Sequence, residues 1–182
     1  MLDCQIAILE NAIARYLSKN EIPGPMGSRH PSIAPFEAFK TKDSYIIIAA
    51  GNDKLFTKLC DVLKIPETAN DERFNSNSLR CENMDHLKEI FEKQLSSKST
   101  NEWVKEMEEL KIPCGPIFNI KQAVENPQIQ ERNMIVKSYH KIIGEFKSAG
   151  NPIKMSTYKD ENTRGNIPDL DEHREKIIKE FS

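Results

Sequence analysis

The fold is decided by one stretch of the chain, Tyr45-Ile-Ile-Ile-Ala-Ala-Gly-Asn-Asp-Lys-Leu-Phe56. Its first half, which ends at Ala50, is apolar enough to form a strand that is buried on both faces. Gly51-Asn-Asp53 interrupts the strand, and from Leu55 to Leu63 the apolar residues return at helical spacing. The stretch therefore predicts a strand, a tight turn and a helix in immediate succession.

A second strand is expected just before this one. Pro35 to Phe39 and Ser44 to Ala50 are both strand candidates, and the polar segment Lys40 to Asp43 separates them. Two strands joined by so short a polar segment are typical of an antiparallel hairpin.

Two amphipathic helices are expected after the strand–turn–helix unit. Apolar residues from Leu87 to Leu95 mark the first, and those from Trp103 to Leu110 mark the second, whose start at Ser99-x-x-Glu102 fits a capping box. Residues 36–110 should thus form a small α+β domain with a short antiparallel sheet. Trp103 should be largely buried in it.

The flanks of this domain differ from it in composition. Residues 1–20 contain an amphipathic helix from about Leu2 to Ser18, which begins without an N-cap, so we expect that further residues precede it in the natural context. Residues 21–35 contain four prolines and two glycines and are expected to be an extended linker.

Residues 111–182 are expected to begin with a second linker at Ile112-Pro-Cys-Gly-Pro116, because both prolines lack an amide donor. A short helix is expected around Ile120 to Glu125. The remaining expectations are short strands at Met134 to Tyr139, Glu145 to Ser148 and Ile153 to Met155, a mobile polar segment at Lys159 to Asp169, and a final helix at Glu172 to Phe181.

Composition excludes several classes of function. The 28 acidic and 26 basic side chains nearly cancel, so nucleic acid and anionic membranes are not expected as partners. The chain contains neither a long apolar stretch nor a signal peptide pattern, and we expect it to be cytoplasmic. The four cysteines are isolated, so neither a disulfide framework nor a metal site is expected.

Standard catalytic motifs are absent from the sequence. It contains no nucleophile elbow, phosphate-binding loop, dinucleotide fingerprint or zinc-protease helix. Its four histidines lie in separate segments, and Cys114 has no neighbouring cation in the sequence that would lower its pKa. No catalytic residue is therefore assigned.

A succession of specific strings nevertheless resembles one family. The strings are Arg29-His-Pro-Ser-Ile-Ala-Pro-Phe-Glu-Ala-Phe39, Gly51-Asn-Asp-Lys-Leu-Phe56, Ile112-Pro-Cys-Gly-Pro-Ile117, Asn126-Pro-Gln-Ile-Gln-Glu-Arg-Asn-Met134 and Gly150-Asn-Pro-Ile-Lys-Met-Ser156. Together, and in this order, they are similar to the C-terminal portion of family III coenzyme A transferases, the group that also contains alpha-methylacyl-CoA racemase.

The resemblance implies a small domain with a flanking helix on the large-domain side and a C-terminal return segment, while the large Rossmann-like domain would be missing. In the family an aspartate of that domain attacks the acyl-CoA thioester, and no position here matches it. Acyl-CoA and a carboxylate are then the substrates, with no separate cofactor. The chain would be inactive alone and form a homodimer or assemble with a large-domain chain.

The resemblance also assigns a substrate-binding turn, Ala50-Gly51-Asn52-Asp53, to a family loop that lies over the acyl group. Gly51 permits close approach of the backbone, and Gly51→Val is expected to depress transfer while leaving the fold nearly intact. In the competing interpretation, Asn52 or Asp53 only caps the following helix. Asn52 is also more typical of the transferases than of the racemase branch, which remains an alternative.

One segment departs from the family pattern. Leu170-Asp-Glu-His-Arg174 lacks the glycine and threonine usual at the start of the last helix. The chain could therefore be a non-catalytic remnant or an interaction module instead of a working component. An apolar stripe on Leu2, Ile6, Leu9 and Ile13 should be exposed if a partner is needed, and buried within the chain or a homodimer otherwise.

Overall fold

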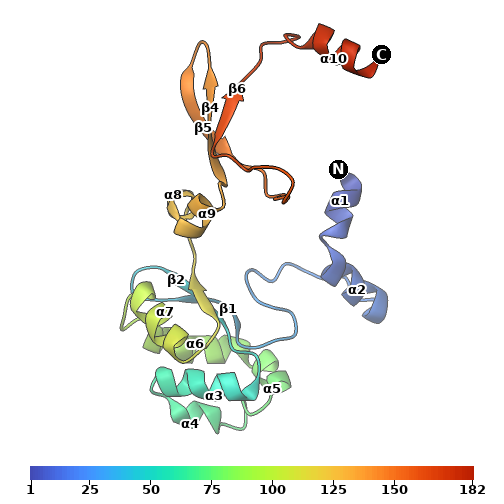
Figure 1. Cartoon of the computed structure of the whole chain (residues 1–182). Helices are drawn as coiled ribbons and strands as arrows, with labels where there is room; N and C mark the ends of the chain where they lie inside the picture. Colours follow the sequence, from blue (N-terminus) through green and yellow to red (C-terminus); the bar gives the residue numbers. More distant parts are fainter. The chain divides into compact units, whose positions relative to one another are not determined.

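The computed structural model describes residues 1–182 and combines ten helices with two small sheets (Figure 1). The expectation of a mixed helix and sheet fold is confirmed at this level. The chain divides into two compact units, Met1–Ile117 and Phe118–Ser182. The finer boundaries expected at residues 20, 35 and 110 stay predictions. No helix has the length and apolar character that a bilayer crossing requires.

The elements follow one another along the chain without a repeat. The helices are α1 (Leu2–Ala7), α2 (Glu10–Lys19), α3 (Asp53–Val62), α4 (Pro66–Ala69), α5 (Asn77–Glu82), α6 (Met84–Leu95), α7 (Thr100–Glu109), α8 (Ile120–Glu125), α9 (Pro127–Glu131) and α10 (Arg174–Phe181). The strands are β1 (Phe36–Lys40), β2 (Tyr45–Ala49), β3 (Cys114–Pro116), β4 (Ile135–His140), β5 (Gly144–Ala149) and β6 (Thr163–Asn166).

The first sheet has the order β1-β2-β3 and is antiparallel throughout. The predicted β1–β2 hairpin is present, and its register pairs Phe36 with Ala49 and Lys40 with Tyr45. The Thr41 amide donates to the Ser44 carbonyl oxygen at 3.0 Å and closes the connection.

The third strand corrects one expectation. Ile112–Pro116 was expected to be an irregular linker, but Cys114–Pro116 pairs with β2. The prolines do not prevent this, because a strand at the edge of a sheet uses only part of its backbone groups for pairing. The Pro113 carbonyl accepts from the Ala49 amide at 2.9 Å, a bond that needs no proline N–H.

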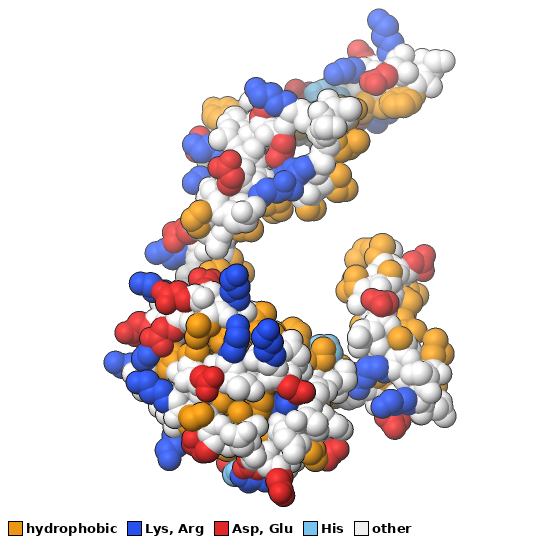
Figure 2. Space-filling view, turned by 60° about the horizontal axis from the view of Figure 1, so that its bottom comes forward, with side chains coloured by type: hydrophobic (Ala, Val, Ile, Leu, Met, Phe, Trp, Pro, Cys, Tyr) orange, Lys and Arg blue, Asp and Glu red, His pale blue; other side chains and the backbone are white.

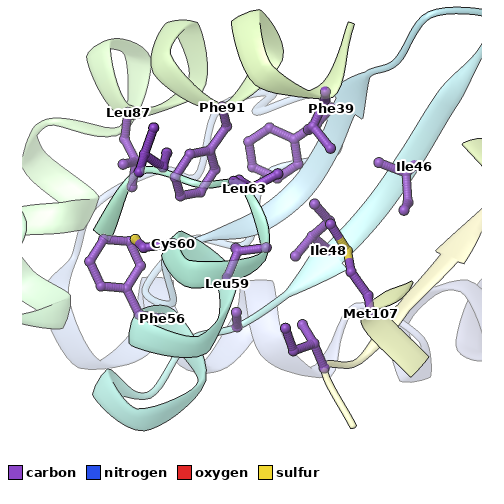
Figure 3. Close-up of a cluster of buried hydrophobic side chains, with 14 of the residues drawn as sticks. Phe39, Ile46, Ile48, Phe56, Leu59, Cys60, Leu63, Leu87, Phe91 and Met107 are labelled. Atoms are coloured by element: carbon purple, nitrogen blue, oxygen red, sulfur yellow. The ribbon is translucent and has the colours of Figure 1, made fainter. Parts of the chain in front are cut away.

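The core of the first unit lies on one face of this sheet (Figure 3). Along β1 and β2 buried residues alternate with half-buried or exposed ones, so Phe39, Ile46 and Ile48 point into the core. Phe56 from α3 and Phe91 from α6 pack there, with ring centroids 6.3 Å apart. The hairpin therefore rests on the helices that the sequence predicts.

Trp103 on α7 is only 3% exposed, which confirms its predicted place in the core. Its indole Nε1 donates to the Leu95 carbonyl oxygen at 2.9 Å, so burial leaves no polar atom of the ring unpaired. The helix begins with the expected capping box between Ser99 and Glu102.

The N-terminal segment is helical but not continuous. The single helix expected from about Leu2 to Ser18 is interrupted between α1 and α2, where the Leu9 amide donates to the Ile6 carbonyl at 3.0 Å in a tighter, three-residue turn. None of the residues of α1 and α2 is buried. The following segment, up to Pro35, contains neither helix nor strand.

The second unit contains the sheet β5-β4-β6. The β4–β5 pair is antiparallel as expected, but the third strand is not the expected Ile153–Met155. Asn151 accepts a hydrogen bond from the Ile153 amide at 3.0 Å, and this local turn removes the amide from pairing. Instead Thr163–Asn166, in the segment expected to be mobile, pairs in parallel with β4.

Candidate functional site

The turn between β2 and α3 is the predicted substrate-binding segment. Ala50 is completely buried, and its amide donates to the Pro35 carbonyl oxygen at 2.9 Å. The Asn52 side-chain oxygen accepts from the Leu55 amide at 2.9 Å and thereby caps α3. The capping role weighed for Asn52 is therefore present, and one of the exposed helix amides is already occupied.

Asp53 has a different function from Asn52. Its carboxylate lies 2.8 Å from Arg80, whose side chain is 0% exposed while that of Asp53 is 75% exposed. Arg80 also donates to the carbonyl oxygens of Ala34 and Phe74, at 2.8 and 3.0 Å, and its guanidinium lies over the Phe56 ring. Arg80 thus ties the start of α3 to the segment that precedes β1.

Gly51 and Asn52 line an apolar depression of about 480 Å³. Neither Ala50 nor Asp53 contributes to this lining. The other lining residues are Ile33, Phe36, Ala49, Leu55 and Asn77. None of these five was among the predicted substrate-binding residues, although Ala49 and Leu55 flank the predicted turn and the string Arg29 to Phe39 contains Ile33 and Phe36.

Gly51 lies directly against one of these residues. A β-carbon built on Gly51 would lie 1.9 Å from the Ile33 Cγ2 atom. In Gly51→Val the Ile33 side chain would have to move, so the substitution would disturb local packing, and the expectation that the fold stays nearly intact remains a prediction. With Ile33 in its present position only a glycine fits here, and the reason is this close packing, because the φ of Gly51 is not in the left-handed region.

Asn77 of α5 holds Ile33 in place. Its side-chain oxygen accepts from the Ala34 amide at 3.0 Å, and its side-chain nitrogen donates to the Ser32 carbonyl at 2.9 Å. These two bonds fix the backbone on either side of Ile33. The segment that packs against Gly51 is therefore held in place by α5.

No nucleophile lies in the depression. Burial raises the pKa of the half-buried Cys114 thiol, with a smaller contribution from Glu108, and burial raises the pKa of Cys60 to about 12. Both thiols stay protonated at neutral pH and are poor nucleophiles. The histidine, cysteine and acidic residues do not gather anywhere in a group of three that could hold a metal ion. The arrangement can bind a ligand but does not by itself supply covalent chemistry.

Residues 1–174 match the family model described as CoA-transferase family III. The chain belongs to CoA-transferase family III. This family III chain is 38% identical over 182 residues to an acetyl-CoA:oxalate CoA-transferase of Acetobacter aceti, and 32% identical over 180 residues to a human succinyl-CoA:glutarate CoA-transferase. The matches cover 100% and 99% of the chain.

A solved structure supports the same assignment. The crystal structure of a CAIB/BAIF family protein from Brucella suis matches with a TM-score of 0.77 and 32% sequence identity, over 99% of this chain and 46% of that one. The family III chain likewise covers 46% and 41% of the two curated relatives. It thus spans about half the length of the proteins it matches.

Proposed function

We propose that this chain is the C-terminal component of an enzyme that moves coenzyme A from an acyl-CoA to a carboxylic acid. The observation that carries the proposal is the similarity along the whole chain to proteins named as CoA-transferases. The component is inactive alone and works after assembly with a chain that supplies a large domain and its aspartate nucleophile. The absence of a nucleophile from the Gly51 depression supports this division of labour.

The surface of the N-terminal helices supports the need for a partner. Leu2, Ile6 and Leu9 are 73%, 50% and 47% exposed, and Ile13 is half-buried. Figure 2 shows apolar side chains exposed on these helices. An exposed apolar stripe of this kind favours burial against another polypeptide, whether a large-domain chain or a second copy.

The turn around Gly51 is the part of this chain that we assign to the acyl-CoA site. It combines a residue without a side chain, an open apolar depression and the start of α3. Concave apolar surfaces with few polar groups are the usual form of small-molecule sites. The capping bond of Asn52 is compatible with this assignment, because it uses only the side-chain oxygen.

The proposal predicts that the purified chain transfers no coenzyme A from acetyl-CoA to oxalate, and that adding a second polypeptide restores transfer. This polypeptide is the part of the Acetobacter aceti relative that the present chain does not match. Its matched control is the same polypeptide with the nucleophilic aspartate replaced by asparagine. Product formation is followed by chromatography of the CoA esters.

Turnover by the isolated chain that a single substitution within it abolishes would refute the inactive-alone proposal. Failure of transfer after a stable complex has formed would favour a non-catalytic remnant. Complex formation is therefore measured independently by sedimentation.

A further inference from the structure

The polar side chains that line the Gly51 depression are mostly occupied. The Asn77 side chain uses both its oxygen and its nitrogen to hold the backbone around Ile33. The Asn52 oxygen is occupied by the Leu55 amide, which leaves the neutral Asn52 amide nitrogen as the available side-chain donor. The other side chains of the lining belong to Ile33, Phe36, Ala49 and Leu55.

No cation reaches the depression. No lysine or arginine contributes to its lining. Arg80 does not line the depression, is completely buried and already donates to Ala34, Phe74 and Asp53. A ligand carboxylate in this depression would find no lysine or arginine side chain as an ionic partner, and the side chains of the lining are mostly apolar, so part of its hydration would be lost without an ion pair. Hydrocarbon would gain from the same environment.

We propose that this depression holds the uncharged hydrocarbon part of the acyl group of the acyl-CoA. The apolar side chains of Ile33 and Leu55 then select acyl groups that carry no second carboxylate on the part of the chain that enters the depression. The inference rests on the proposed function, because it assumes that the Gly51 turn lies at the acyl-CoA site. A distal carboxylate, if a substrate carries one, then has to be bound outside this depression.

The test uses the isotope-labelled full chain and nuclear magnetic resonance titrations with three small probes. These are the N-acetylcysteamine thioesters of butyrate and of succinate, and free N-acetylcysteamine as the control for the thiol arm. Butyryl thioester should shift the signals of Gly51 and Leu55 and saturate at a concentration at least tenfold below that for succinyl thioester. Each methylene that leaves water should tighten binding by at most about fourfold.

A variant provides the reverse experiment. Ile33→Arg places a cation beside the depression and should shift the preference at least tenfold toward the succinyl thioester. Ile22→Arg is the matched control, since Ile22 is exposed and does not line the depression. The control should keep the butyryl preference. Thermal unfolding of both variants establishes that they are folded.

The outcomes separate the two proposals. Succinyl binding at Gly51 and Leu55 that equals or exceeds butyryl binding would overturn the inference and leave the acyl-site assignment standing. Shifts by free N-acetylcysteamine as large as those by butyryl thioester would mean that the thiol arm occupies the depression, which also overturns the inference. If no probe shifts these signals, both the acyl-site assignment and the inference fail.

Discussion

Arg80→Met is expected to lower the free energy of unfolding by about 3 to 5 kcal/mol. Methionine fills much of the same volume, but it cannot donate to the carbonyl oxygens of Ala34 and Phe74, which Arg80 reaches at 2.8 and 3.0 Å. Leaving a buried acceptor unpaired costs roughly 1 to 3 kcal/mol for each group. The cation over the Phe56 ring is lost as well. Urea denaturation followed by circular dichroism measures the change.

Asp53→Asn is the matched control for Arg80. The Asp53 side chain is 75% exposed, so its ion pair with Arg80 is screened by water. We expect this variant to lose at most about 1 kcal/mol. If the two substitutions cost the same amount, then the ion pair and not the buried carbonyl bonds would be the main contribution of Arg80.

Trp103→Ala is expected to cost roughly 3 to 5 kcal/mol, because the substitution removes a buried aromatic side chain and leaves a cavity. It also leaves the Leu95 carbonyl oxygen without its indole donor. The measurement is again the urea midpoint. An unchanged midpoint would remove Trp103 from the core.

Lys98→Met tests how much of the stabilisation by Trp103 comes from the contact of its ring with Lys98 and how much comes from burial in the core. The Lys98 Nζ atom lies 4.4 Å from the Trp103 ring and also pairs with Glu106. Because this contact is partly exposed to solvent, its loss should cost at most about 1 kcal/mol. A loss as large as that of Trp103→Ala would contradict the assignment of the stabilisation to burial.

The sequence alone predicted those helices and strands whose own residues show a regular spacing of apolar side chains. The β1–β2 hairpin, α3 and α7 with its capping box all follow from residues within each element. The strands β3 and β6 were missed because their sequences, Cys114–Pro116 and Thr163–Asn166, show no alternation of apolar and polar residues. They form through backbone pairing with strands that lie elsewhere in the chain.

The candidate site was predictable only in part for a related reason. Gly51 and Asn52 could be proposed from the turn itself, and both line the depression. Ile33 and Asn77 lie far from Gly51 in sequence, and the bonds between Asn77 and the backbone around Ile33 have no local signature. The close packing of Ile33 on Gly51 likewise becomes visible only once the chain is folded.

In the proposed function the Gly51 turn forms part of an acyl-CoA site in an assembled enzyme. Gly51→Ala alone does not test it, because the new side chain would collide with Ile33. In an Ile33→Ala background the nearest atom is the β-carbon of residue 33 at 3.5 Å, an ordinary contact. The double variant can therefore be compared with Ile33→Ala at matched stability. In the competing interpretation, in which Asn52 only caps α3, Asn52→Ala should cost about 0.5 to 2 kcal/mol and lower transfer only as folded protein is lost.

The decisive measurement is the rate of CoA transfer per folded complex for the double variant and for Ile33→Ala, each assembled with the large-domain chain. We expect nearly equal unfolding midpoints and a rate that is about tenfold or more lower for the double variant, because a misplaced acyl group reacts slowly. Equal rates at equal stability would exclude the Gly51 turn from the acyl-CoA site and leave Gly51 with a packing function only.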